Sequence, residues 1–165
     1  MATRRAGTAL PSDGDLFFKL VRVVNLTARP FVETLARKHR LSLNEWRAIV
    51  VLASHPGSAA HEIVQATGLD KMSVSRAIAA LDRHGRILKR GDPRDARRTL
   101  LELSAAGRRL YEVIGAGGSA REVQLFARLD AASKAQLSLL VDALLESLAA
   151  ADAAPARPAR RAAGA

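Results

Sequence analysis

The sequence predicts a mainly α-helical fold with one small β-hairpin, and three observations support this fold class. Alanine supplies 33 of the 165 residues and aromatic side chains only six, a composition that favours closely packed helices. Apolar residues recur at helical spacing over most of the chain. Only residues 86–103 differ, because there two short apolar runs flank a charged segment, as in a hairpin.

The composition also narrows the classes of function. Lys and Arg outnumber Asp and Glu by 26 to 16, and this net charge of +10 favours a polyanionic partner, nucleic acid before membrane. The chain has no cysteine, which excludes disulfides, thiolate zinc sites and cysteine nucleophiles. We find no apolar stretch long enough to span a bilayer and no signal peptide, so we expect a soluble cytoplasmic protein.

The first predicted element is a long helix over residues 13–39, with an apolar stripe at helical spacing from Phe17 to Leu35. Pro30 cannot donate a backbone hydrogen bond, so we expect a kink or break between Leu26 and Pro30. A helix of about 25 residues reaches about 38 Å, longer than a small domain is wide. Part of the stripe is therefore expected to contact a second subunit.

The second helix has a clear start signal. Ser42 and Glu45 have the spacing of a capping box, and Leu41 with Trp46 can close a hydrophobic staple around it. We expect this helix to end before Pro56.

Two further helices form a helix-turn-helix unit. One runs over residues 59–67 and stops at Gly68. Asp70 caps the other, over residues 71–84, which stops at Gly85. Only three residues separate the two helices, which is typical of this unit.

Two long helices complete the chain. Ser104 caps the first, whose middle is weakened by Gly115, Gly117 and Gly118. Asp130 caps the second, which carries a wide leucine stripe. We expect this stripe to form a helical bundle between two subunits, with a core within one chain as the alternative.

The helix over residues 71–84 has the surface of a recognition helix. Its apolar side chains share one face, and the opposite face begins with small hydroxyls and basic groups that suit the floor of the major groove. A solvated surface would show the same pattern in isolation. The candidate DNA contacts on this helix are Lys71, Ser73, Ser75 and Arg76.

The hairpin that follows is strongly basic. Residues 83–98 hold seven basic and two acidic residues, or half of the net charge in a tenth of the chain. We expect a wing with a long charged tip between the apolar runs 87–88 and 100–103, and Arg94 at the tip can enter the minor groove. Asp95 and Arg97 can pair to hold the tip in shape. The candidate DNA contacts on the wing are Arg90, Arg94, Arg97 and Arg98.

These segments resemble the MarR family of bacterial transcriptional regulators. The resemblance rests on DKMSVSR at residues 70–76, Gly85, DPRDARR at residues 92–98, LELS at residues 101–104 and Gly107, and it extends over about residues 15–148. It implies a homodimer with a winged helix-turn-helix in each subunit. Family members bind palindromic operators, usually repress, and release DNA when a small ligand, often an aromatic anion, binds.

The resemblance assigns a role to each part of the chain, and one residue departs from the family's pattern. It implies a single domain over residues 13–150, with dimerisation helices at 13–40 and 104–150 and the winged helix at 41–103. Residues 1–12 and 151–165 are expected to be disordered extensions. The family usually has an apolar residue at the position of Arg86, so either the wing shifts by one residue or Arg86 faces a phosphate.

The ligand site is predicted only in outline. An aromatic acid would suit the flat ring of Trp46 and the cationic side chains, although each of these residues could equally have a local structural partner. The candidate ligand contacts are Arg22, His39, Trp46 and Arg47.

Three alternatives remain at this stage. Catalysis is disfavoured, because the chain lacks a nucleophile elbow, a phosphate-binding glycine loop and an HExxH motif. A non-specific or architectural DNA-binding protein would use charge without sequence preference. A metal-responsive regulator of the same fold could use His55, His61 and Glu62, although exposed helix ends explain these histidines more simply. We expect no metal or other cofactor.

Overall fold

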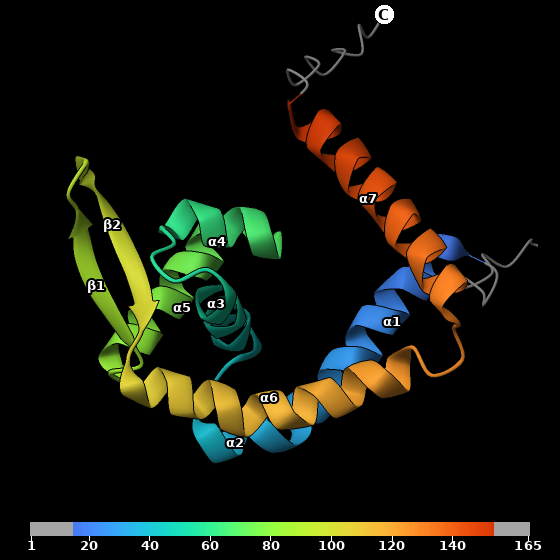
Figure 1. Ribbon diagram of the computed structural model, residues 1–165, viewed down its shortest axis with the longest axis horizontal. Helices are drawn as coiled ribbons and strands as arrows, with labels where there is room; N and C mark the ends of the chain where they lie inside the picture. The colour runs from blue at the N-terminus through green and yellow to red at the C-terminus, as the bar shows by residue number, and fades with distance from the viewer. Residues whose placement is uncertain (1–14, 154–165) are drawn as a thin grey trace, which may run out of the picture. The chain divides into compact units, whose positions relative to one another are not determined.

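The structure is a computed structural model that describes residues 15–153, without the side chains of residues 116, 118, 119 and 153 (Figure 1). The described residues divide into two compact units, with the boundary between Arg121 and Glu122. The predicted fold class, mainly α-helical with one two-stranded hairpin, is confirmed. The elements in chain order are α1 (Leu16–Pro30), the π-helix η1 (Phe31–Leu35), α2 (Ala36–His39), α3 (Leu43–Ser54), α4 (Ala60–Thr67), α5 (Lys71–Arg83), β1 (Ile87–Asp92), β2 (Asp95–Leu103), α6 (Ala105–Leu125) and α7 (Ala131–Ala153).

The first helix is irregular after its proline. α1 is capped by Asp15, whose carboxylate accepts the Phe17 N–H at 2.9 Å, and it continues through Pro30 before η1 begins. The irregular segment therefore begins directly after the expected span, at Phe31. The Leu26 carbonyl, which has no helical donor because Pro30 lacks an N–H, accepts the Arg121 guanidinium of α6 at 2.8 Å.

The apolar stripe of this helix is mostly not buried within the single chain. Only Phe31 is buried, and Ala28 and Leu35 are half-buried. The stripe and its neighbours are otherwise exposed at Leu16, Phe17, Phe18, Leu20, Val21, Val23, Val24, Leu26 and Val32. Helical periodicity predicts an apolar face but not the chain that covers it.

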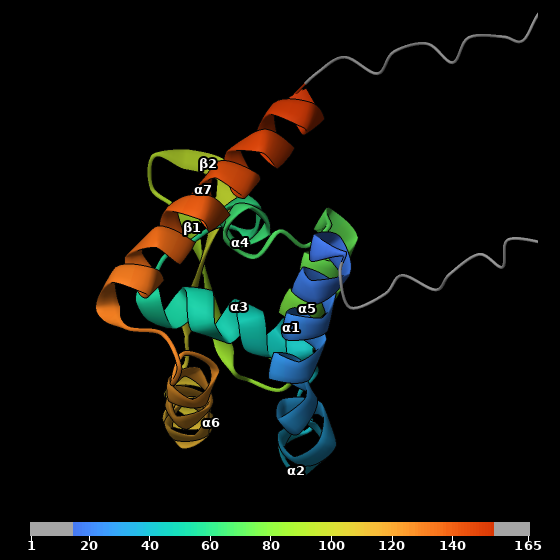
Figure 2. The same cartoon turned by 90° about the vertical axis from the view of Figure 1, so that its right-hand side faces the viewer.

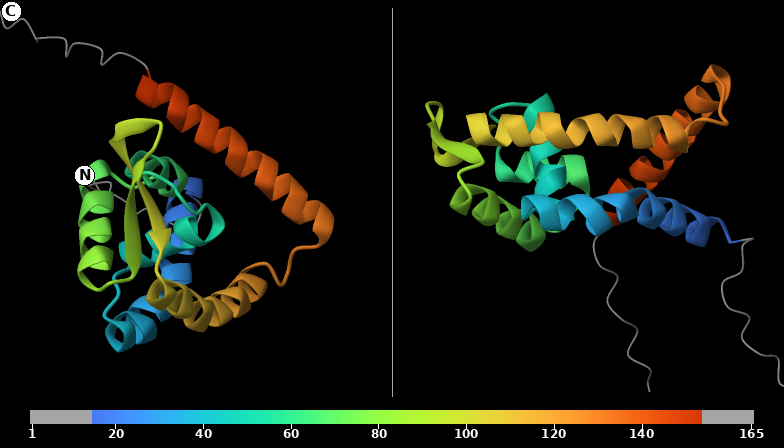
Figure 3. Two further views of the ribbon diagram at one scale, coloured as in Figure 1. Left: turned by 60° about the vertical axis from the view of Figure 1, so that its left-hand side comes forward. Right: turned by 90° about the horizontal axis from the view of Figure 1, so that it is seen from below.

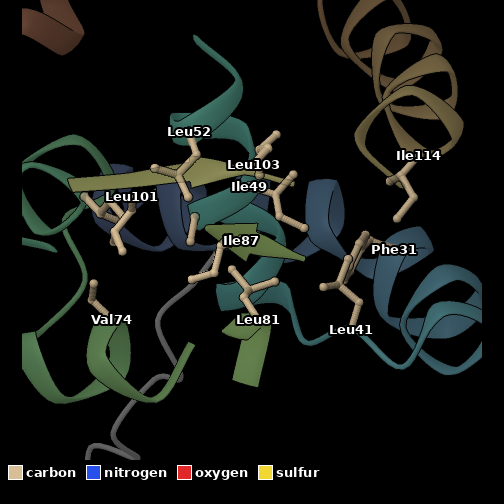
Figure 4. Packing of buried hydrophobic residues seen from close by; sticks show 12 residues of the cluster. Phe31, Leu41, Ile49, Leu52, Val74, Leu81, Ile87, Leu101, Leu103 and Ile114 are labelled. Carbon is tan, nitrogen blue, oxygen red and sulfur yellow. The ribbon is translucent and has the colours of Figure 1, made fainter. Parts of the chain in front are cut away.

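The hydrophobic core lies between α3, α4, α5 and the base of the hairpin. Figure 4 shows side chains from these elements pointing toward one another, with Phe31 of η1 and Ile114 of α6 at one side. The largest fully buried side chains are Ile49, Leu52, Ile63, Val74, Leu81 and Ile114. Since Val74 and Leu81 belong to α5, core packing fixes the orientation of the candidate recognition helix.

The start of α3 follows the prediction only in part. The Ser42 hydroxyl accepts the Glu45 N–H at 3.2 Å and donates to the Glu45 carboxylate at 2.9 Å. The reciprocal half of the capping box is not formed, because that carboxylate turns toward the guanidinium of Arg86, 3.5 Å away. α3 ends at Ser54, before Pro56 as predicted.

Trp46 joins three elements by aromatic stacking. Its ring centroid lies 6.1 Å from that of Phe31 on η1 and 5.8 Å from that of Tyr111 on α6. In Figure 2, α3 accordingly lies above α2 and the first part of α6. The staple between Trp46 and Leu41 stays a prediction, although both belong to the same hydrophobic cluster.

The helix-turn-helix unit has the predicted boundaries. α4 ends at Gly68, which has the left-handed φ of +66° that favours glycine. Asp70 caps α5 by accepting the Ser73 N–H at 2.8 Å. The helix stops before Gly85, whose φ is +63°.

The hairpin differs from the prediction in the length of its strands. Residues 89–92 and 95–98 lie in β1 and β2, so only Pro93 and Arg94 separate the strands, where a long charged tip was expected. Apolar patterning cannot show these strand residues, because their side chains are charged and mostly exposed. The hairpin base is held by Leu101, which exchanges backbone hydrogen bonds with Gly57 and Ser58 at 2.9 and 3.0 Å.

α6 and α7 follow the predicted starts. Ser104 accepts the Gly107 N–H at 3.1 Å, and Asp130 accepts the Ser133 N–H at 2.8 Å. α6 is continuous despite its glycines, and α7 extends to Ala153, beyond the predicted end at residue 150. The predicted disorder at residues 1–12 and in the rest of the tail lies outside the described residues. Among residues 15–153, no helix combines the length and apolar character needed to cross a membrane.

Candidate DNA-binding surface

The N-terminal half of α5 presents the predicted polar face. Lys71, Ser75 and Arg76 are exposed. Ser73 is half-buried, and its hydroxyl donates to the Asp70 carboxylate at 2.6 Å. The Ser73 hydroxyl and the Ser73 N–H together hold the pKa of Asp70 below its ordinary value. The Ser73 hydroxyl proton is therefore committed within the protein, while the Ser75 side chain is exposed.

Two aspartates shape the turn of the wing. The Asp92 carboxylate accepts the Arg94 N–H, and the Asp95 carboxylate accepts the Arg97 N–H, each at 2.9 Å. The predicted pairing of Asp95 with the Arg97 guanidinium is therefore wrong in its atoms, because the partner is the backbone amide. An Asp side chain that binds the amide two residues later is typical of tight turns. The side chains of Arg94 and Arg97 are left exposed.

Arg98 holds the wing against the helix-turn-helix unit. Its guanidinium lies 2.9 Å from the Glu62 carboxylate of α4 and 3.7 Å from the Asp92 carboxylate. Glu62 also accepts the Ala59 N–H at 2.6 Å, and this bond, followed by that from Arg98, holds the pKa of Glu62 below its ordinary value. Arg98 is thus half-buried and engaged within the protein, whereas Arg90, Arg94 and Arg97 are exposed.

Two further basic residues of the wing have acidic neighbours. Lys89 is 2.6 Å from Asp82 on α5. Arg90 is 3.8 Å from Glu102 on the opposite strand, but its side chain is 64% exposed. Arg90 therefore remains accessible to a phosphate, whereas Lys89 links the wing to the recognition helix.

A groove of about 540 Å³ runs between the start of α3 and α5. Its lining includes Ser42, Asn44, Arg76 and Arg83. Asn44 and Arg83 are not among the residues predicted from the sequence to contact DNA. The signal for Arg83 is its spacing of seven residues from Arg76, two helical turns along one face, whereas Asn44 gives no local signal.

The predicted ligand contacts lie on three different helices. Arg22 is exposed on α1, and Arg47 on α3 donates to the Asn44 side chain at 3.4 Å. Trp46 belongs to the aromatic stack. His39 lies at the end of α2, and its backbone carbonyl accepts a hydrogen bond from Arg86. The ring Nε2 of His39 is buried and has no hydrogen-bond partner within the described part of the chain.

The position of Arg86 resolves the departure noted in the sequence. β1 begins at Ile87, and the Arg86 side chain turns inward, only 13% exposed, toward the carbonyls of His39 and Arg40 and the carboxylate of Glu45. Burial lowers the pKa of Arg86, and Glu45 opposes that shift. The expected phosphate contact of Arg86 is therefore wrong, whereas a one-residue shift of the wing relative to the family stays a prediction.

The alternative of a metal-responsive regulator finds no support in the geometry. Within residues 15–153, no three His, Asp or Glu side chains are grouped as a metal site requires. Glu62, which the hypothesis needs, instead holds Arg98 and the Ala59 N–H.

A helix-turn-helix unit followed by a two-stranded hairpin, both with exposed basic residues, defines a winged-helix DNA-binding protein. Residues 40–98 match the profile of the MarR family. The comparison with curated proteins found no match.

Several solved structures of transcriptional regulators have a fold similar to that of this chain. A MarR/EmrR family transcriptional regulator from Acinetobacter sp. ADP1 is 29% identical, with a TM-score of 0.72 over 80% of this chain and 93% of that one. A probable transcriptional regulator from Pseudomonas aeruginosa is 26% identical, with a TM-score of 0.67 over 80% and 98%. The S. aureus MepR–DNA complex, 19% identical with a TM-score of 0.71 over 83% and 99%, shares the fold. The chain therefore resembles MarR-family transcriptional regulators, in the sequence of residues 40–98 and in its fold.

Proposed function

We propose that this regulator is a cytoplasmic, ligand-responsive repressor that binds a palindromic operator as a homodimer. The observation that carries the proposal is the exposure of basic side chains on two adjacent elements, α5 and the wing. A recognition helix in the major groove and a wing at the neighbouring minor groove would use both sets together.

The exposed residues divide between base and phosphate contacts. Arg76 can fork onto guanine, and Ser75 can donate or accept at a base edge. Ser73 offers only its acceptor, because its proton is held by Asp70. Arg94 at the turn has the length to enter the minor groove.

The other basic and polar groups are assigned to phosphates. Lys71, Arg90 and Arg97 are exposed beside the base-reading residues. Arg83 and Asn44 line the groove behind α5, where a backbone phosphate of the flanking strand would fit. Arg98 is assigned to holding the wing in place.

The exposed apolar stripes support the homodimer. The side chains on α1 form one such stripe, and a second lies on α7 at Leu139, Leu140, Leu144, Leu145 and Leu148. Contiguous apolar surfaces of this kind typically mark protein interfaces. A two-fold axis would place two recognition helices about 34–36 Å apart, which matches half-sites one helical turn apart. The variant Leu144→Glu should sediment as a monomer where the wild type is a dimer.

An aromatic acid is the proposed effector, held by Arg22, His39, Trp46 and Arg47. The stack of Phe31, Trp46 and Tyr111 supports this, because it offers aromatic rings where η1 and α6, from the predicted dimerisation helices, meet α3 of the winged helix. Two structures of the same fold concern ligands: PcaV from Streptomyces coelicolor in complex with its natural ligand, and Bordetella bronchiseptica BpsR, whose DNA binding is regulated by 6-hydroxynicotinic acid. Thermal-shift screening of aromatic acids, followed by an assay for DNA release, tests the assignment.

The decisive experiment is selection of the operator from random duplex DNA. The wild type should select a palindrome and prefer it over unrelated DNA by about 10³ or more at fixed salt. Arg76→Ala should weaken operator binding by about tenfold or more and relax base preference at one position in each half-site. Arg37→Ala, which removes an exposed charge from α2, is the control. Binding that depends on salt but not on sequence would instead favour the architectural alternative.

A further inference from the structure

Arg86 lies where four segments of the chain meet: the end of α5, the start of β1, the start of α6 and the corner between α2 and α3. Its backbone N–H donates to the Leu81 carbonyl at 2.8 Å, which closes α5 just after the left-handed Gly85. Its own carbonyl accepts the Ser104 N–H at 3.0 Å, at the start of α6. The backbone of this one residue therefore connects the recognition helix, the base of β1 and the first turn of α6.

The side chain of Arg86 connects these segments to a fourth one, the corner between α2 and α3. Its guanidinium donates to the Arg40 carbonyl at 2.9 Å and to the His39 carbonyl, and lies 3.5 Å from the Glu45 carboxylate. Arg40 has a φ of +47°, the one positive φ of a non-glycine residue among the described residues. The guanidinium thus binds the carbonyls of a strained corner, where α2 ends.

Arginine is suited to this position by its geometry. A planar guanidinium presents several donors in a fixed fork, so it can bind two carbonyls and a carboxylate at once. A lysine has a single flexible ammonium, and an apolar side chain has no donor. The corner that Arg86 holds continues into η1 and α1, which carry the apolar stripe assigned above to the dimer interface.

We propose that Arg86 is a positioning residue for operator binding, which fixes the angle of α5 and the wing relative to the arm formed by α1, η1 and α2. The inference rests on the proposed function, since it requires a dimer on paired half-sites. Each base pair added between half-sites shifts the second site by about 3.4 Å and rotates it by about a tenth of a turn. A rigid connection at Arg86 makes the dimer sensitive to that change.

The test measures binding by fluorescence anisotropy to three forms of the operator that the wild type selects: the natural spacing, one base pair inserted between half-sites, and a single half-site. The spacing ratio is the affinity for the natural spacing divided by that for the insertion. Arg86→Met should lower this ratio about fivefold, within the range of about 2- to 30-fold that coupling networks transmit, while half-site affinity stays unchanged. Arg86→Lys should lower the ratio less, and the charge-matched control Arg37→Met should not change it.

The possible results distinguish a failure of the positioning role from a failure of the proposed function. A folded Arg86→Met dimer with the wild-type spacing ratio would overturn the positioning role. So would an equal loss of affinity for the half-site, because Arg86 would then act on the local DNA contacts alone. If circular dichroism shows that Arg86→Met does not fold, the lysine variant decides by the same ratio. A wild type without preference for paired half-sites would reject the proposed function itself, whatever the variants do.

Discussion

Replacing Gly107 by alanine should destabilise the protein, although alanine is the better helix former. A Cβ at this position would lie 2.1 Å from the Arg86 carbonyl oxygen, nearly 1 Å closer than such contacts are found, and 3.3 Å from the Leu103 side chain. The start of α6 must therefore move away from the base of the wing. This movement weakens the hydrogen bond from Ser104 to the same carbonyl.

The expected loss of stability in Gly107→Ala follows from opposing contributions to the free energy of unfolding. Overpacking of this kind costs about 1–3 kcal/mol. The weakened hydrogen bond adds about 1 kcal/mol, and alanine recovers about 1 kcal/mol through its helix propensity. The net loss of about 2 kcal/mol should lower the unfolding midpoint by about 4–8 °C for a chain of this size.

The control for Gly107→Ala lies on the same helix. Gly117 is exposed, and a Cβ there would meet nothing within 4 Å, so Gly117→Ala should stabilise the protein by about 0.5–1 kcal/mol. Urea and thermal unfolding followed by circular dichroism measure both variants at one protein concentration, because dimer stability depends on concentration. The reasoning fails if Gly107→Ala is as stable as the wild type, or if both substitutions stabilise it.

Two further predictions concern carboxylates of the DNA-binding unit. The Ala59 N–H, followed by Arg98, lowers the pKa of Glu62, so its ionised form stabilises the fold above the ordinary pKa of glutamate and loses this effect as the pH falls through the lowered value. Glu62→Gln should therefore flatten the acid side of a plot of unfolding midpoint against pH; an unchanged profile would contradict the role of the ion pair. Asp70→Ala should weaken operator binding by releasing Ser73 and the start of α5, and Asp70→Asn should restore most of it, as measured by anisotropy.

The sequence predicts best those features that depend on neighbouring residues. The caps at Ser104, Asp70 and Asp130 and the stop at Gly68 were all predicted correctly, because each is decided within one helical turn. The winged-helix order followed from the same local signals. The strands of the wing were underestimated, because charged strands that are exposed on both faces carry no alternation of apolar and polar residues.

Local sequence patterns could not predict the partners of the charged side chains. Arg98 binds Glu62 across 36 positions, and Arg86 binds the Arg40 carbonyl across 46. Spacing within a helix or strand gives no information on such pairs, because the fold alone brings them together. Asp95 and Arg97 are close in sequence, yet the observed partner is a backbone amide, which competes with every local side-chain pairing.

The basic residues of the wing region therefore have two separate roles. Lys89, Arg98 and Arg86 are bound to acids or carbonyls of α5, α4 and the α2–α3 corner, and so determine where the wing is held. Arg94 and Arg97 are exposed and form no ion pair with any described residue, so their charge remains available to DNA. A wing with little apolar core of its own needs such anchoring, because a two-stranded hairpin is only marginally stable in isolation. The high charge of this segment thus stabilises the wing's position as well as attracting DNA.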